Sequence, residues 1–161
     1  MALSNPFIVL SYVGGPALLT NATSLFIMST SNRFGRAIDR SRFLSEKLSG
    51  SNADPLRAIY LQEMPDVHRR VLLIGRAMVC FYLAVGSFAL ATLGSILGAV
   101  LAESTENAAT YGVVFIAIAT GLIGFAAFIA GAWMLVMESR MAVRSLSREY
   151  TEAIRLAQQG T

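Results

Sequence analysis

Four arginines and one aspartate stand close together just beyond the first apolar stretch of the chain. They are Arg33, Arg36, Asp39, Arg40 and Arg42. Guanidinium groups gathered at helical spacings can hold phosphate or carboxylate groups through paired N–H donors. Basic clusters beside a membrane also attract anionic lipids. This cluster is therefore a candidate contact for lipid headgroups, a phosphorylated ligand or an acidic partner.

The same cluster has a second interpretation that needs no ligand. Asp39 is three residues from both Arg36 and Arg42, a spacing that allows ion pairs along one helix. Arginines flanking an apolar span also determine which side of the membrane a segment occupies. Both interpretations, a binding site and a set of topology determinants, remain open from the sequence.

A second group of polar residues lies inside the first apolar stretch. Thr20, Ser24 and Ser31 are separated by four and seven residues and so share one helical face, which Asn21 borders. Such a face can line an aqueous path in an oligomer. It can also join helices, because polar side chains in spans hydrogen-bond across helices for roughly 0.6 to 2 kcal/mol each.

Small residues and one charge pair complete the candidate contacts. Close helix packing is predicted at Gly94, Gly98, Gly121, Gly124 and Gly131. The spacing of these glycines is equally compatible with contacts within one chain and between chains. Arg76 lies near the start of one apolar run and Glu138 directly after the end of the next, at the expected cytoplasmic boundary of adjacent spans, which predicts an ion pair between them.

The elements that position these residues are predicted to be membrane spans. Hydrophobic residues make up 55% of the chain and charged residues 14%, against roughly 45 to 50% and about 25% in soluble domains. Two long apolar runs, 71–101 and 111–137, exceed the ~20 residues that cross a bilayer. The first span, about 7–31, is interrupted at Pro16. We expect its helix to begin there, after an extended or interfacial lead-in.

The distribution of positive charge predicts the orientation of the spans. All 13 Lys and Arg residues lie within 33–76 and 140–155. Cytoplasmic segments of membrane proteins collect these residues. We therefore expect the N-terminus outside and the C-terminus in the cytoplasm. No cationic signal region precedes the first span, and so we expect residues 1 to 161 to be the mature protein.

Helical periodicity continues beyond the apolar runs. Apolar and small residues recur every three or four positions at Phe34, Ala37, Ser41, Leu44 and Leu48. A similar seam is predicted from Val143 to Ala157. Between them, Asp54-Pro55 predicts a helix start and Pro65 a kink. The expected fold is one all-α membrane domain, 1–161, with three transmembrane helices, a cytoplasmic helical hairpin at about 32–70, and an extension at about 138–158. The hairpin and the extension are expected to form a small bundle.

These features together resemble a known family. The run from Asn32 to Arg40, followed by Arg69-Arg70 before a long second span, resembles an uncharacterised bacterial family of small membrane proteins, classed as a domain of unknown function. The resemblance extends from about Pro16 to Tyr150. It implies an inner-membrane location and a three-helix fold, and it transfers no activity.

The sequence favours an interaction protein over an enzyme. No catalytic constellation, metal-binding set or phosphate loop is evident, and no cofactor is expected. A lone Cys80 cannot form an intramolecular disulfide, and no nucleic-acid-binding motif accompanies the basic residues. We expect a helical subunit in the lipid bilayer that self-associates or joins a larger membrane complex, with anionic lipid headgroups as possible ligands. The alternative is a homo-oligomeric channel or small-solute transport protein lined by Thr20, Asn21, Ser24 and Ser31.

Overall fold

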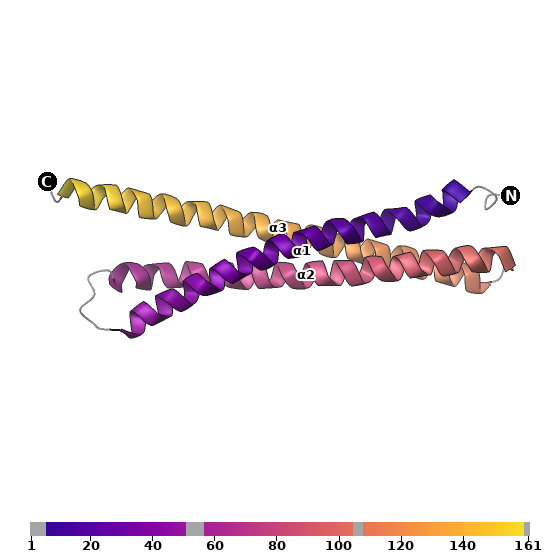
Figure 1. The fold of residues 1–161 in the computed structure, drawn as a ribbon, viewed down its shortest axis with the longest axis horizontal. Coiled ribbons are helices and arrows are strands. Elements are labelled where there is room, and N and C mark those ends of the chain that lie inside the picture. The colour runs from indigo at the N-terminus through magenta and orange to yellow at the C-terminus, as the bar shows by residue number, and fades with distance from the viewer. Residues whose placement is uncertain (1–5, 51–56, 105–107, 160–161) are drawn as a thin grey trace. The chain divides into compact units, whose positions relative to one another are not determined.

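The chain folds into long α-helices (Figure 1). A computed structural model describes residues 6–50, 57–104 and 108–159. Helix α1 spans Pro6–Ser49, α2 spans Arg57–Ser104 and α3 spans Ala108–Gln159. No strand occurs in these described ranges, so the expected all-helical class is confirmed for them.

The start of α1 differs from the sequence prediction. The helix begins at Pro6 and continues through Pro16, so the expected extended lead-in is wrong. A proline inside a helix removes one backbone hydrogen bond and crowds the residue before it. Here that residue is Gly15, which has no Cβ to clash with the proline ring. Pro65 likewise lies inside α2 without ending it. The predicted start at Asp54-Pro55 lies outside the described residues.

Two of the helices are long and apolar enough to cross a membrane. Apolar windows of sufficient length lie within Ile59–Leu101 of α2 and Thr110–Arg144 of α3. Only 33% of the first window and 11% of the second is buried. A core helix of a soluble protein would be mostly buried. Helix α1 does not reach the same apolar content, because hydroxyl and amide side chains interrupt its first half.

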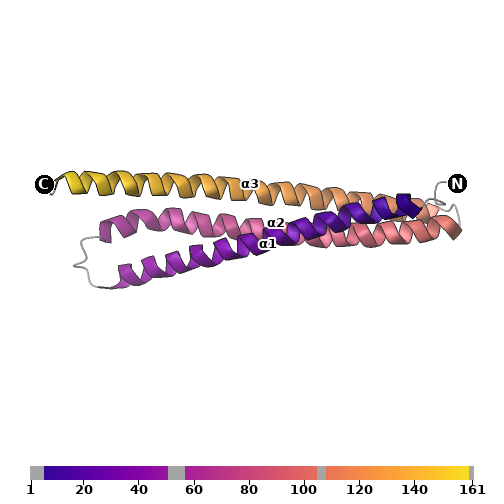
Figure 2. The same ribbon diagram turned by 45° about the horizontal axis from the view of Figure 1, so that its top comes forward.

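Packing divides the chain into two compact units, and each helix contributes to both. Unit 1 comprises Met1–Ser29 and Met78–Gly131. Its parts of α2 and α3 run together in both views (Figures 1 and 2), whereas the first half of α1 diverges from them toward the N-terminus in Figure 1. The core of unit 1 consists of Ala84, Phe88 and Ala127, with Leu19 and Phe128 packed against it. The aromatic ring of Phe26 lies 5.7 Å from that of Phe81 and 5.2 Å from that of Phe128.

Unit 2 comprises Thr30–Ala77 and Ala132–Thr161. The predicted seam of α1 is confirmed there, because all five of its side chains are buried or half-buried. Phe34 of this seam lies close to α2, since a Cβ atom added at Gly75 would be 3.6 Å from its ring. On α2 in the same unit, Val67, Ile74 and Ala77 are buried. The predicted seam of α3 is wrong at its first position, since Val143 is 65% exposed. Its remaining side chains, from Leu146 to Ala157, lie outside the described ones.

The buried face of α2 has a heptad-like period. It comprises Val67, Ile74, Ala77, Phe81, Ala84, Phe88 and Ala91. Most of these residues are three or four positions apart, and Val67 and Ile74 are seven apart. An average spacing near 3.5 is typical of helices that pack as in coiled coils. The same period places Arg70, which lies between Val67 and Ile74, on the packed face.

Candidate functional site

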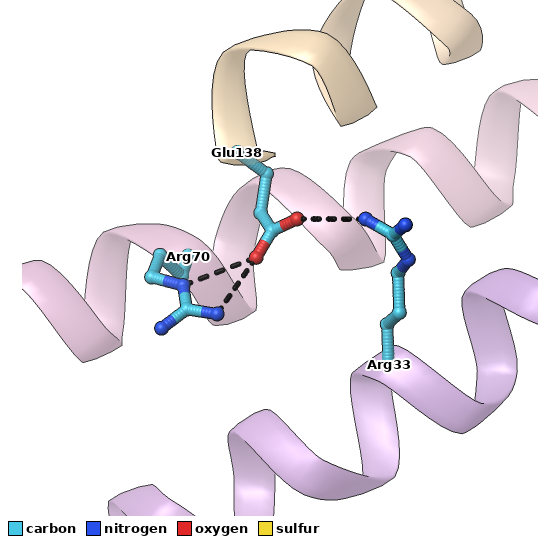
Figure 3. A network of polar contacts seen from close by, with 3 residues as sticks. All are labelled: Arg33, Arg70 and Glu138. Atoms are coloured by element: carbon cyan, nitrogen blue, oxygen red, sulfur yellow. Dashed lines mark hydrogen bonds and ion pairs between the residues drawn. The ribbon is translucent and has the colours of Figure 1, made fainter. Parts of the chain in front are cut away.

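A buried carboxylate joins segments of all three helices in unit 2. Glu138 of α3 is only 3% exposed. Its Oε1 atom accepts hydrogen bonds from Nε and Nη2 of Arg70 on α2, at 3.0 and 2.9 Å. Its Oε2 atom accepts one from Nη1 of Arg33 on α1, at 3.4 Å. Figure 3 shows the two guanidinium groups on opposite sides of the carboxylate.

The position of Glu138 follows from the packed face of its helix. Gly124, Gly131 and Glu138 are spaced by seven residues, and all three are buried. A charged group removed from water costs several kcal/mol unless it is paired and hydrogen-bonded. The two arginines supply that compensation. Glu138 therefore lies at a core position and depends on its two partners.

A cavity of about 340 Å³ opens beside this carboxylate, within unit 2. Its polar lining consists of Arg33, Arg36, Arg40, Arg70, Glu138 and Ser139. The remaining lining residues are small or apolar. Positive charge therefore exceeds negative charge in the lining, with four guanidinium groups against one carboxylate.

The four arginines differ in how they are paired. Arg40 forms a two-pronged ion pair with Glu63, its Nε and Nη2 atoms lying 2.8 and 2.7 Å from the two carboxylate oxygens. Its guanidinium also lies 5.5 Å from the ring centre of Phe43. Arg36 is exposed, and in the described part of the chain it forms no ion pair.

The structure brings together part of the predicted basic cluster. Arg33, Arg36 and Arg40 line the cavity, whereas the exposed side chains of Asp39 and Arg42 do not. Within the described ranges, no ion pair joins Asp39 to its neighbouring arginines. Arg70 was not among the predicted site residues. The spacing of Arg70 from Val67 and Ile74, by three and four residues, was the signal that could have identified it.

The predicted ion pair between Arg76 and Glu138 is not formed. Glu138 pairs with Arg33 and Arg70 instead, and the Arg76 side chain is exposed. Arg76 directly precedes Ala77 on the packed face of α2, so its own side chain points elsewhere. The acid was identified correctly and its partner was not.

The four polar residues predicted to form a face on α1 do not meet another helix as a group. Thr20 is half-buried, whereas Asn21, Ser24 and Ser31 are exposed. The hydroxyl of Thr20 donates to the Pro16 carbonyl oxygen at 2.9 Å, and that of Ser24 donates to the Thr20 carbonyl oxygen at 2.9 Å. Among the described side chains of α1 in unit 1, Thr23 is a fully buried hydroxyl residue, and it was not part of the predicted face.

All five predicted packing glycines face a neighbouring helix of the same chain, in unit 1. A Cβ atom added at Gly94 would lie 2.8 Å from Cβ of Ala117. Added at Gly98, it would lie 3.2 Å from Val114. Gly121, Gly124 and Gly131 approach Ala91, Phe88 and Phe81 in the same way. These glycines permit α2 and α3 to approach closely within one chain.

No group of three or more metal-ligating side chains is found among the residues that the structure describes. Residues 14–148 match the family described as "Protein of unknown function (DUF2721)". The chain belongs to this family. The matched DUF2721 region contains the whole candidate site, and it agrees with the expected family of unknown function. No curated protein and no solved structure matches the chain.

Proposed function

We propose that this DUF2721 protein is an integral interaction protein of the bacterial inner membrane, which self-associates or attaches to a larger membrane complex. Unit 1 provides three spans with the N-terminus outside, and unit 2 provides a basic helical bundle in the cytoplasm. The role is binding rather than catalysis. The observation that carries this proposal is the large apolar surface exposed by unit 1, set against the charged side chains that pack unit 2.

The exposed apolar side chains of unit 1 are too numerous for a water-soluble surface. They include Leu18, Leu25, Leu90, Phe115 and Ile116, each at least 60% exposed. Large apolar side chains exposed in this number are typical of lipid or protein contacts. Helix α1 shares this unit with two helices that are long and apolar enough to cross a membrane, which supports a third span alongside them.

Asn21 supports self-association in particular. Its amide is exposed on α1 in unit 1, and no hydrogen bond from it is found among the described residues. An unpaired amide in hydrocarbon costs several kcal/mol. A neighbouring polar group on a second copy or another subunit would satisfy it. By contrast, Thr20 and Ser24 already bond to their own helix, so no observation favours the channel alternative.

Particle mass and ion flux, measured on the same purified preparation, test this proposal. The wild-type protein in nanodiscs should have a mass above that of one 17.3 kDa chain. Asn21→Leu should lower that mass by weakening association. Thr20→Val is the matched control, because the Thr20 hydroxyl is satisfied within its own helix, and it should leave the mass unchanged. A wild-type monomer without partners would contradict self-association, and robust flux abolished by Asn21→Leu at constant mass would establish a channel.

A further inference from the structure

We propose that the cavity of unit 2 is a binding site for a phosphate group, with Arg36 as its principal unpaired contact. The site does not require the proposed self-association, because all of its lining residues belong to unit 2 of one chain. The phosphate can belong to a lipid headgroup or to a soluble phosphorylated ligand. Both present the same chemistry to the cavity.

The balance of charge in the cavity points to an anion. Four guanidinium groups line it. The carboxylates of Glu63 and Glu138 pair with three of them. The lining itself thus carries four guanidinium groups and the carboxylate of Glu138, and Glu63 adds a carboxylate beside Arg40. Like charges held at short range are costly unless an anion lies between them.

The geometry leaves hydrogen-bond donors free for that anion. A guanidinium group has five N–H donors. Arg33 uses one long contact of 3.4 Å to Glu138, so most of its donors remain available. Arg36 is three residues from Arg33 and four from Arg40, on the same face of α1. Arginine forks match the oxygens of phosphate in pairs, which favours phosphate as the ligand.

Glu138 has a positioning role in this proposal. Its buried carboxylate fixes Arg33 and Arg70 from two different helices before any ligand arrives. Groups held in place in advance lose less entropy on binding. The cavity volume of about 340 Å³ lies at the small end of ligand sites, which span roughly 300–1,000 Å³. That size suits a compact polar group.

Two binding measurements on the full chain test the proposal and distinguish the two sources of phosphate. In the first, inorganic phosphate is titrated by calorimetry into protein in phosphatidylcholine nanodiscs. In the second, the protein is placed in phosphatidylcholine vesicles that also contain phosphatidylglycerol. Native mass spectrometry then counts the phosphatidylglycerol molecules that remain bound to the extracted protein. Saturable phosphate binding indicates a soluble ligand, whereas retention of phosphatidylglycerol without phosphate binding indicates a lipid headgroup.

The matched variants are Arg36→Gln, inside the cavity, and Arg42→Gln, which makes the same change of charge on the same helix outside it. We expect Arg36→Gln to weaken binding about tenfold, because charge-assisted hydrogen bonds are lost, and Arg42→Gln to change it less than twofold. Both side chains are exposed, so circular dichroism should show intact helices for both. Equal losses from the two variants, or no binding of either probe by the wild type, would overturn the proposal.

Discussion

Unit 1 and unit 2 pack parts of the same three helices by different means. In unit 1, glycines such as Gly94 and Gly131 lie against alanine and phenylalanine side chains, and the described core holds no charge. In unit 2, a buried carboxylate at Glu138 joins arginines from two other helices. Lipid gives helices no hydrophobic reason to associate, so close fit must hold them together. In water, apolar burial drives packing, and a paired charge can fix which faces meet.

The largest expected loss of stability comes from removing the buried charge of Glu138 in unit 2. Glu138→Gln should lower the free energy of unfolding by about 2 kcal/mol. Breaking a fully buried ion pair costs roughly 3–5 kcal/mol, but Arg33 and Arg70 are 45% and 31% exposed, so water partly solvates them. Denaturant titration in detergent micelles, followed by circular dichroism, measures the change. Glu46→Gln, at an exposed acid of α1, is the control, and an equal loss from both variants would contradict the account.

A smaller effect should come from the glycine packing of unit 1. Gly94→Ala should destabilise the protein by about 1–2 kcal/mol, because the new methyl group would meet Cβ of Ala117 at 2.8 Å and force α2 from α3. Gly86→Ala on the same helix has nothing within 4 Å of the added Cβ. It should be neutral or stabilising, since alanine favours the helix. The same titration compares the two variants, and a loss of stability in Gly86→Ala matching that in Gly94→Ala would argue against close packing at Gly94.

The smallest effect is expected for the exposed ion pair of unit 2. Glu63→Gln breaks the two contacts to Arg40 and should cost about 0.2–1 kcal/mol, because Arg40 is 44% exposed to water. High salt should remove most of this difference. Arg76→Gln should leave the unfolding free energy unchanged. A loss from Arg76→Gln as large as that from Glu138→Gln would indicate that the Arg76–Glu138 pair predicted from the sequence does form.

The sequence was most informative about which side chains of a helix are buried, because the spacing of apolar residues alone defines that face. The spacing from Phe34 to Leu48 predicted which side chains of α1 are buried in unit 2. The packing glycines were also identified, although their spacing could not distinguish contacts within one chain from contacts between chains. Periodicity defines the faces of a helix, and the structure adds which faces meet.

The partner choice of Glu138 could not be predicted for the same reason. Arg70 and Arg76 lie six residues apart on α2, on different faces, and only the packing of α2 against α3 decides which one reaches the acid. The hydroxyl groups of Thr20 and Ser24 illustrate a second limit. A hydroxyl inside a helix can bond the carbonyl four residues earlier, so a polar face does not by itself predict a partner helix.

We propose that unit 1 faces lipid and that unit 2 faces water on the cytoplasmic side. Leu61 of unit 2 and Leu90 of unit 1 both lie on α2 and are 56% and 60% exposed. In a Cys80→Ser background, Leu61→Cys should react with a membrane-impermeant maleimide in inverted vesicles and not in intact cells. Leu90→Cys should react in neither, although both cysteines should react after denaturation. Equal labelling of the two positions in inverted vesicles would contradict the account.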